Sequence, residues 1–459
     1  MNNNEIIKIV SQQRAYFNKG FTLEVNLRIK YLKKLKQVIK NSEENIEKAL
    51  YLDLNKSATE SYMCEIGMVY SELNYMLKHV RSFAKKKHVR TPIAQAISKS
   101  YVIPSPFGVT LIMSPWNYPF LLSIDPLIDA LAAGNTIVLK PSAYAPNTSK
   151  IITEIVHQVF PGELVEVITG GRQENQTLLE QNFDYIFFTG SKTVGKEVLR
   201  HASEHLTPVT LELGGKSPCI IDETADIKIT AKRIVFGKFL NAGQTCVAPD
   251  YIVCHQTQVD ALLNALKTEI ELQFSTNPLN NLDYCKIINL KHFKRLLNLM
   301  QDNNLYYGGQ SNLDELKINP TLIYPCSEND SIMQEEIFGP ILPILVYENL
   351  ENLIDKINQK ETPLALYIFS RNQQHIDYVL SHAHFGGASV NETVMHLASP
   401  YMGFGGLKES GMGAYHGKNG FDTFTHYKSI IDKKTWFDLP MRYQPFTSKK
   451  YKLIKFFLK

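Results

Sequence analysis

The sequence lacks the patterns that mark several classes of protein. None of its six cysteines forms a C-x-x-C pair, which argues against a zinc site or a thioredoxin-like centre, and so few thiols in 459 residues do not make a disulfide framework. No stretch approaches the ~18 apolar residues that a membrane-spanning helix requires. The chain does not start with a basic segment followed by an apolar one, so no signal peptide is expected. These absences favour a reducing, cytoplasmic compartment, and no metal site is expected.

A strong charge of either sign is also missing. The chain has 49 lysines and arginines against 45 aspartates and glutamates, a formal net charge of +4. That excess is too small and too evenly spread to indicate nucleic-acid binding. Hydrophobic residues make up 44% and charged residues 20%, as is typical of a globular protein. The length is sufficient for two or more lobes with a large buried core.

The order of apolar patterns predicts an α/β protein. The first ninety residues have apolar side chains at helical spacing, as at Leu23, Leu27, Leu35 and Val38. From about residue 100, short apolar runs alternate with helical segments, which predicts parallel βαβ units that bind ligands at the carboxyl ends of their strands. The predicted strands are 108–113, 136–139, 164–168, 185–188, 218–221, 251–254, 341–346, 364–369 and 423–431, and the predicted helices include 120–133, 259–274 and 350–357.

Cys246 is the most informative single residue. It lies in the segment Asn-Ala-Gly-Gln-Thr-Cys-Val-Ala-Pro at 241–249, among small and polar residues at the end of a predicted helix. That setting leaves room for another molecule to approach the thiol. A free thiol with a pKa of ~8.5 is only slightly ionised at neutral pH. Cys246 therefore needs a base or a thiolate-favouring site if it is to act as a nucleophile.

Glu212 is the best candidate for such a base. It stands between two leucines at the end of a predicted strand, in Thr-Leu-Glu-Leu-Gly-Gly-Lys at 210–216. Partial burial there would raise the pKa of its carboxyl group and suit general-base catalysis. The alternative is a buried acid that backbone donors satisfy.

Two segments have the features of a phosphate or nucleotide site. Residues 187–195 follow a predicted strand and open a helix, with Gly190 and Gly195 permitting close approach to a ligand and the helix N-terminus favouring a phosphate. The spacing is not that of the G-x-G-x-x-G fingerprint, and a plain glycine-bearing turn is the alternative. Lys140 directly follows another predicted strand in the same crevice, where the alternative is a surface lysine.

Two further loops carry groups that chemistry can use. Pro-Trp-Asn-Tyr-Pro at 115–119 braces the Asn117 amide between two prolines, which suits the stabilisation of an oxyanion, although a turn with aromatic packing has the same pattern. Gln-Glu-Glu-Ile-Phe-Gly-Pro at 334–340 adds an acidic pair, commonly a solvated turn, and a rigid loop at Phe338 suited to holding a flat ring.

These segments together resemble the aldehyde dehydrogenase superfamily over nearly the whole chain, to about Thr425. The joint occurrence of P-W-N-Y-P, L-K-P-S, F-T-G-S-x-x-V-G, L-E-L-G-G-K-S-P, G-Q-T-C-V-A-P, E-E-I-F-G-P and a late P-x-x-G-F-G-G-x-x-x-S-G-M-G is highly specific. The segments 246–251 and 415–418 are similar to the class 3 branch, which includes fatty and medium-chain aldehyde dehydrogenases and is typically dimeric.

The resemblance implies roles for the matching residues. Cys246 would attack the aldehyde to give a thiohemiacetal and then a thioester, Asn117 would stabilise the oxyanion, and Glu212 would activate the hydrolytic water. Because relatives that transfer the acyl group generally lack this glutamate, Glu212 implies a free acid as the product. The implied contacts of the nicotinamide cofactor are Lys140, Gly190, Ser191, Gly195, Leu213, Glu336, Phe338 and Trp116.

The resemblance also implies the architecture: two Rossmann-like open-sheet lobes and a small β oligomerisation element. We expect a nucleotide-binding domain at 1–85 and 104–210, a catalytic domain at 211–395, and a bridging or oligomerisation element with a C-terminal tail at 86–103 and 396–459. A homodimer is expected.

One departure from the family pattern concerns the cofactor. NAD-preferring relatives often carry a glutamate three positions after the lysine, where this chain has Ala143. Without that carboxylate, a 2′-phosphate would meet no repulsion there and would pair with Lys140. We therefore expect NADP to be accepted alongside NAD.

The substrate and the tail are less closely defined by the sequence. Loose positional resemblance implies an aldehyde channel with aromatic walls, suited to apolar aldehydes, although core packing explains each residue equally well. The tail at 449–459 mixes lysines with aromatic residues, so it is a candidate for peripheral contact with an anionic membrane as well as for packing on a partner subunit. The candidate channel residues are Tyr62, Tyr118, Thr245, Phe404 and His416.

Two other functions compete with an NAD(P)-dependent aldehyde dehydrogenase. A cysteine hydrolase that acts on esters would use Cys246 and Glu212, but it needs no nicotinamide site. A non-enzymatic protein on the same fold would be expected to have lost Cys246 or Glu212, and both are present.

Overall fold

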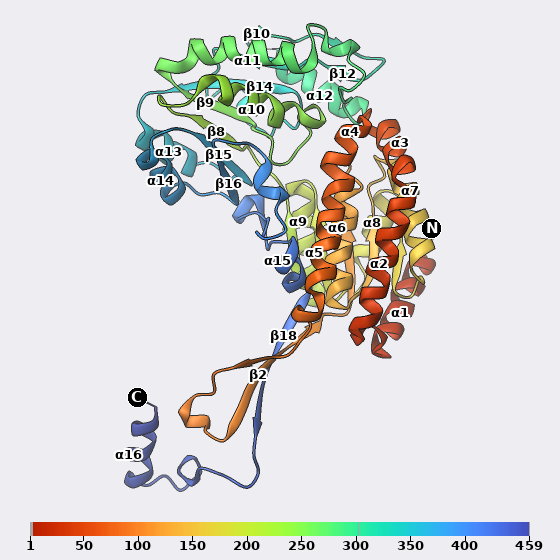
Figure 1. Ribbon diagram of the computed structural model, residues 1–459, viewed down its shortest axis with the longest axis vertical. Coiled ribbons are helices and arrows are strands. Elements are labelled where there is room, and N and C mark those ends of the chain that lie inside the picture. The colour runs from red at the N-terminus through yellow and green to blue at the C-terminus, as the bar shows by residue number, and fades with distance from the viewer. Residues whose placement is uncertain (1–2, 302, 459) are drawn as a thin grey trace.

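Two open sheets and a projecting antiparallel arm make up the computed structural model, which describes residues 3–301 and 303–458. Figure 1 shows the two lobes beside each other and the arm extending away from both. The predicted α/β class, with two open-sheet lobes and a small β element, is confirmed.

The first lobe is built on a six-stranded sheet in the order β17-β7-β6-β3-β4-β5, in which only β17 runs antiparallel to its neighbour. Its strands are β3 (Val109–Met113), β4 (Thr136–Lys140), β5 (Val165–Val167), β6 (Tyr185–Thr189), β7 (Val209–Glu212) and β17 (Gly411–Met412). Its helices are α1 (Asn3–Asn18), α2 (Val25–Asn41), α3 (Glu43–Leu54), α4 (Ala58–Ser61), α5 (Gly67–Phe83), α6 (Leu121–Ala133), α7 (Pro146–Val159), α8 (Arg172–Leu179), α9 (Lys192–His205) and α15 (Gly417–Thr423).

The second lobe contains a seven-stranded sheet in the order β10-β13-β14-β9-β8-β15-β16, parallel except for β10. Its strands are β8 (Pro218–Ile221), β9 (Tyr251–His255), β10 (Leu305–Tyr307), β13 (Thr321–Ile323), β14 (Ile341–Tyr347), β15 (Ala365–Phe369) and β16 (Gly387–Val390), with a separate pair β11 (Ser311–Asn312) and β12 (Lys317–Ile318). Its helices are α10 (Ile227–Phe239), α11 (Val259–Phe274), α12 (Leu290–Gln301), α13 (Leu350–Asn358) and α14 (Gln373–His382).

Burial explains why the central strands form where they do. All residues of β3, β4, β6, β8 and β15 are buried, which is the expected pattern for parallel strands covered by helices on both faces. Helix α2 shows the spacing of an amphipathic helix, with Ile29, Leu32, Leu35 and Val38 on its buried face.

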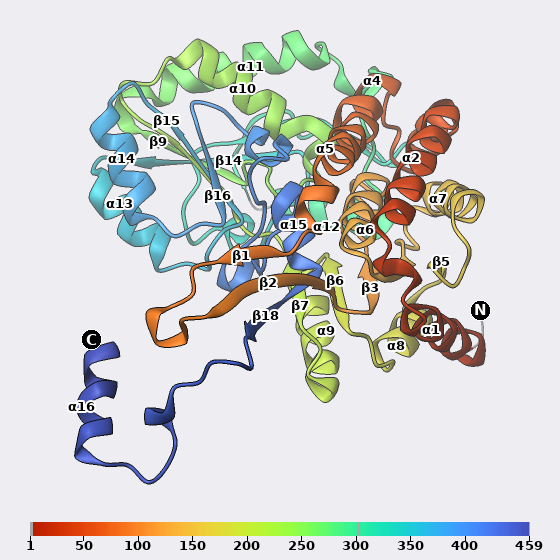
Figure 2. The same ribbon diagram turned by 60° about the horizontal axis from the view of Figure 1, so that its bottom comes forward.

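The arm is a three-stranded antiparallel sheet of β1 (Lys87–Val89), β2 (Ser98–Pro106) and β18 (Thr425–Lys433). It leads to α16 (Ser448–Phe457), which Figures 1 and 2 both show apart from the two lobes. One predicted boundary needs correction here. The predicted strand at 423–431 begins only at Thr425, because α15 extends to Thr423.

The tail at 449–459 is helical as far as Phe457, and Lys459 lies outside the described residues. Within residues 3–301 and 303–458, no helix combines the length and the apolar character needed to cross a membrane.

Candidate active site

The sequence predicted that Cys246 lies at the end of a helix, but in the structure it lies on a loop. Helix α10 ends at Phe239, and the chain then turns through Asn241 and Ala242, both at φ +51°, and Gly243 at φ +74°. A Cβ on Gly243 would lie 2.2 Å from the backbone oxygen of Gly339. Glycine is therefore required at this point, because the loop before Cys246 packs directly on the loop that follows Glu336.

The thiol of Cys246 is partly buried and has carboxylates near it. Burial raises its pKa well above the ordinary value, and the charges of Glu212 and Glu336 raise it further. Cys246 is consequently a neutral thiol at neutral pH, and nucleophilic attack requires a group that takes its proton.

Glu212, the last residue of β7, is buried without a partner. Its side chain is 1% exposed, and neither carboxylate oxygen has a hydrogen-bond partner among the described residues. Burial raises its pKa to about 8. Backbone donors therefore do not satisfy this acid, and its pKa is close to the value that suits a general base near neutral pH.

Asn117 belongs to the loop between β3 and α6, where the carboxyl end of a strand meets a helix. Its side chain is buried, and its backbone oxygen accepts two hydrogen bonds, from Asn241 Nδ2 at 2.7 Å and from Lys56 Nζ at 3.3 Å. The loop of Asn117 is thus joined directly to the loop of Cys246.

Lys56, which donates to this loop, forms a fully buried ion pair with Glu65, with 2.6 Å between Nζ and Oε1. The other oxygen of Glu65 accepts from the backbone amides of Phe120 at 2.8 Å and Leu121 at 3.2 Å, at the start of α6. Glu65 lies in a single turn of π-helix, Tyr62–Ile66, an irregularity that is frequent at functional sites. No sequence pattern had indicated Lys56 or Glu65, because a lysine between asparagine and serine resembles a surface residue.

Lys140 ends β4 and is buried, contrary to the alternative of a surface lysine. Its Nζ donates to the backbone oxygens of Gly170 at 2.8 Å and Pro141 at 3.0 Å, and burial lowers its pKa to about 8. Glu174 exerts an opposing charge on it and accepts from the Gly171 amide at 2.7 Å. Glu174 is an acid beside the Lys140 crevice that the motif comparison did not identify.

The segment of Gly190 opens α9 as predicted. The Gly190 amide donates to the backbone oxygen of Glu212 at 3.0 Å, so the carboxyl ends of β6 and β7 are joined. Ser191 caps α9, whose first residues are largely exposed, and a Cβ on Gly195 would lie 2.6 Å from Leu213 Cδ2. The exposed N-terminus of α9 and the close contact at Gly195 fit an anionic, extended ligand such as a dinucleotide pyrophosphate.

Glu336 faces the same region from the second lobe. Burial raises its pKa to about 8, and its Oε1 accepts from the Gly215 amide at 3.3 Å. Trp116 and Phe338 meet edge to face with 5.3 Å between ring centroids. Trp116 of the first lobe and Phe338 of the second are therefore in contact, with Glu336 two residues before Phe338, and such a group of rings beside a carboxyl suits a flat ring and its ribose.

The candidate channel residues fall into separate groups. The hydroxyls of Tyr118 and Thr245 lie 2.6 Å apart, next to the Cys246 loop. The rings of Phe404 and His416 have centroids 6.0 Å apart and both contact Tyr415. Tyr62 is 45% exposed.

His416 lies among carboxylates as well as rings. Its Nδ1 is 3.6 Å from Asp125 Oδ2 and 3.8 Å from Glu72 Oε2, and all three side chains are buried. These contacts hold His416 between Asp125, Glu72 and the neighbouring aromatic rings.

The chain is similar to known proteins over nearly its whole length. Residues 1–430 match the model of the aldehyde dehydrogenase family. The 4,4′-diaponeurosporen-aldehyde dehydrogenase of Staphylococcus aureus is 47% identical over 97% of each chain, and the dimeric NADP-preferring aldehyde dehydrogenase of Canis lupus familiaris is 40% identical over 97% of this chain and 99% of its own. A solved structure of Staphylococcus aureus AldH in its substrate-bound state has a TM-score of 0.97 at 46% identity and covers all of both chains.

The fold is that of a nicotinamide-dependent oxidoreductase. The chain belongs to the aldehyde dehydrogenase family, as the sequence motifs predicted, and it oxidises an aldehyde with NAD or NADP.

Proposed function

We propose that this enzyme oxidises an apolar aldehyde to the free carboxylic acid through a covalent thioester on Cys246. The observation that carries the proposal is the association of three groups: the Cys246 thiol, the unpartnered carboxyl of Glu212, and Asn117, whose loop is tied to the Cys246 loop through Asn241.

Each of the three groups has a chemical task. Glu212 takes the proton of the Cys246 thiol as Sγ attacks the carbonyl carbon, while the Asn117 side-chain amide and the Cys246 backbone amide donate to the developing oxyanion. That proton passes to solvent before the thioester is hydrolysed. The bound nicotinamide supplies the hydride acceptor. Glu212 takes a proton from the water that hydrolyses the thioester, and its raised pKa makes it basic enough for that step.

The cofactor pocket is assigned from the surroundings of Lys140 and Glu336. Lys140 would hold the adenosine ribose. Glu336 would hold the nicotinamide ribose, with Phe338 and Trp116 packed beside it. The pyrophosphate would be flanked by Gly190, Ser191, Gly195 and Leu213. Ala143 is exposed and brings no carboxylate to the Lys140 crevice. This favours acceptance of NADP alongside NAD.

Two features support an apolar substrate. Tyr118 is a buried aromatic residue next to the Cys246 loop. Phe404, also buried, packs against Tyr415, and burial together with the neighbouring Glu212 and Cys246 raises the pKa of Tyr415. A relative is named for diaponeurosporen-aldehyde, a further reason to test long apolar aldehydes first. Tyr62, Thr245 and His416 complete the proposed channel.

The arm is assigned to a homodimer interface. Strand β1 is exposed throughout and β18 mostly so, and both are edges of the three-stranded sheet, so either offers unpaired backbone groups to a second copy. The proposed domain division follows the same scheme: 1–85 and 104–210 bind the nucleotide, and 211–395 carry the nucleophile. Residues 86–103 and 396–459 form the bridging element and the C-terminal tail, apart from β17 and α15, which belong to the first lobe. Size-exclusion chromatography with light scattering tests the dimer.

Helix α16 is assigned to peripheral contact with an anionic membrane. None of the described residues of this helix is buried. It carries Lys449, Lys450, Lys455 and the exposed Phe456, and the exposed Leu458 directly follows it. Co-sedimentation with anionic and with neutral vesicles should retain the full-length protein on the anionic ones only. Equal binding by a variant shortened after residue 433 would contradict this assignment.

The central test is a series of aldehydes of increasing chain length, assayed by the absorbance of the reduced cofactor. Cys246→Ala should lower kcat by at least about a thousandfold, whereas the thiol control Cys326→Ser should leave it unchanged. An ester hydrolase would instead act without a nicotinamide cofactor. Retained dehydrogenase activity in Cys246→Ala would overturn the mechanism.

A further inference from the structure

The second sheet has an edge, rich in polar side chains, that the dehydrogenase reaction does not use. Asp222 directly follows β8, His255 is the last residue of β9, and Ser370 directly follows β15, so three neighbouring parallel strands end together. Glu212 and Cys246 precede β8 and β9 in the chain and therefore belong to the opposite ends of these strands. The carboxyl edge is where open parallel sheets commonly bind ligands.

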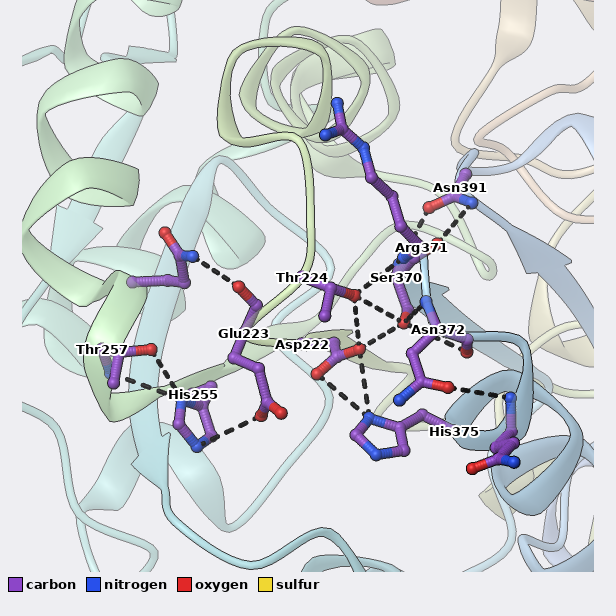
Figure 3. Close-up of polar contacts among 12 residues, drawn as sticks. Asp222, Glu223, Thr224, His255, Thr257, Ser370, Arg371, Asn372, His375 and Asn391 are labelled. Carbon is purple, nitrogen blue, oxygen red and sulfur yellow. Dashed lines mark hydrogen bonds and ion pairs between the residues drawn. The ribbon is translucent and has the colours of Figure 1, made fainter.

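Metal-ligating side chains converge at this edge. One ligand atom from each of Asp222, Glu223 and His375 lies within 4.8 Å of the others, and His375 Nδ1 is 3.2 Å from Asp222 Oδ2. On the other side of Glu223, its Oε2 is 3.4 Å from His255 Nε2. Figure 3 shows the Glu223 carboxylate between the His255 ring and the Asp222 carboxylate.

The surrounding contacts hold these side chains in place. Asp222 is 1% exposed, and its Oδ2 accepts from Thr224 Oγ1 at 2.9 Å and from the Ser370 hydroxyl. Thr257 Oγ1 lies 2.8 Å from His255 Nδ1, the ring nitrogen away from Glu223. Such partners on the far side of a ligand orient it and fix its tautomer.

A cation on the same edge of the sheet does not compete for these carboxylates. Arg371, the nearby cation, pairs with Asp226 and points away from the cluster in Figure 3.

From this arrangement we infer a binding site for a divalent transition metal of the zinc class, formed by Asp222, Glu223 and His375, with His255 beside Glu223 as an orienting partner rather than a ligand. An imidazole beside two carboxylates favours such an ion over Mg²⁺ and Ca²⁺, which prefer oxygen alone. At bond lengths of about 2.0–2.1 Å, tetrahedral zinc ligands lie roughly 3.3 Å from one another, close to the spacing of Asp222 and His375. Glu223 is partly exposed, which leaves the ion a path from solvent.

An ion at this edge would join the end of β8 to the first turn of α14, which carries His375. Its effect would be on the stability of the second lobe. Because Glu212 and Cys246 belong to the other ends of the strands, removing the ion should lower Tm without changing kcat.

The test uses full-length, tag-free protein stripped with a chelator and titrated with Zn²⁺ by calorimetry and with Co²⁺ by absorbance. One equivalent should bind, Tm should rise by a few degrees, and the cobalt spectrum should lack the charge-transfer band of a thiolate ligand. His375→Ala and Glu223→Gln, both changes at partly exposed side chains, should each weaken binding by about tenfold or more. The control His382→Ala changes another histidine of α14, outside the cluster.

Three results would overturn the inference: no saturable binding, equal binding by wild type and His375→Ala, or a thiolate band that disappears in Cys246→Ala. The last would show that the ion binds at the catalytic thiol. Since His375→Ala and Glu223→Gln leave the buried Asp222 in place, loss of binding in these variants with an unchanged kcat is distinguishable from unfolding.

Discussion

The side-chain amide of Asn241 donates to the backbone oxygen of Asn117 across 2.7 Å, and this bond joins the nucleophile loop to the oxyanion loop. Asn241 is itself held at φ +51°, with its backbone amide donating to Glu60 at 2.8 Å. The relative position of Cys246 and Asn117 therefore depends on a group that contacts neither the aldehyde nor the cofactor in the proposed mechanism.

Replacing Asn241 should consequently affect turnover more than binding. We expect Asn241→Ala to lower kcat by about tenfold to a hundredfold with little change in KM, because a misplaced oxyanion donor weakens the transition state more than the ground state. Steady-state kinetics of wild type, Asn241→Ala and the exposed control Asn264→Ala measure this split. A kcat within twofold of wild type would mean that the bond does not position the loop.

The buried pair of Lys56 and Glu65 leads to a prediction about stability. Lys56→Met leaves the Glu65 carboxylate buried without its cation and should lower the free energy of unfolding by about 3–5 kcal/mol. The double variant Lys56→Met, Glu65→Gln removes that lone charge while the new side-chain amide oxygen still accepts from the backbone amides at the start of α6, so it should be more stable than the single variant. Chemical denaturation of the three proteins decides this, and equal midpoints for the single and double variants would contradict it.

The raised pKa of Glu212 predicts how the activity changes with pH. Since burial raises its pKa to about 8, the fraction of ionised base increases as the pH rises towards and past that value, and the rate of thioester hydrolysis should increase with it. A pH profile of kcat under conditions where hydrolysis limits turnover checks the direction. Glu212→Gln should remove this rise and should release little acid after the first turnover.

The same group should destabilise the native state at high pH. A carboxyl with a raised native pKa binds a proton in the folded chain that the unfolded chain has already lost, so stability falls as the pH rises above the unfolded value. Glu212→Gln has no such dependence, and its Tm advantage over wild type should widen from about pH 5 to about pH 8. A constant difference in Tm across that range would show that Glu212 finds a partner in solution.

Cys246, Glu212 and Asn117 could be proposed as a catalytic trio from the sequence because each lies in a short local motif, and their roles stay a prediction. Helix α11 and strand β8 were also predicted with the bounds they have, since one has a long helical pattern and the other a short apolar run. Strand β16, Gly-Ala-Ser-Val, has no apolar run and forms because β15 offers its edge. Lys56 and Asn241 could not be found in the same way, because their partner Asn117 is distant in the chain.

The last prediction concerns the choice between NAD and NADP, and the structure adds a second residue to the argument that rested on Ala143. Ala143 leaves the expected position without a carboxylate, but Glu174 is close enough to Lys140 to act on its pKa. A 2′-phosphate at Lys140 would therefore meet one negative charge rather than none. Ala143→Glu should lower kcat/KM for NADP by at least about tenfold and leave NAD nearly unchanged, because it adds a second repulsive carboxylate.

Glu174→Gln should act in the opposite direction and improve the use of NADP, since it removes the acid already present while its side-chain oxygen can still accept from the Gly171 amide. Kinetics of both variants with both cofactors separate the two positions, with Glu180→Gln as a control at an exposed site. If wild type prefers NAD by a thousandfold and neither variant alters that ratio, the selectivity for the adenosine ribose lies in other residues than Lys140 and its neighbours.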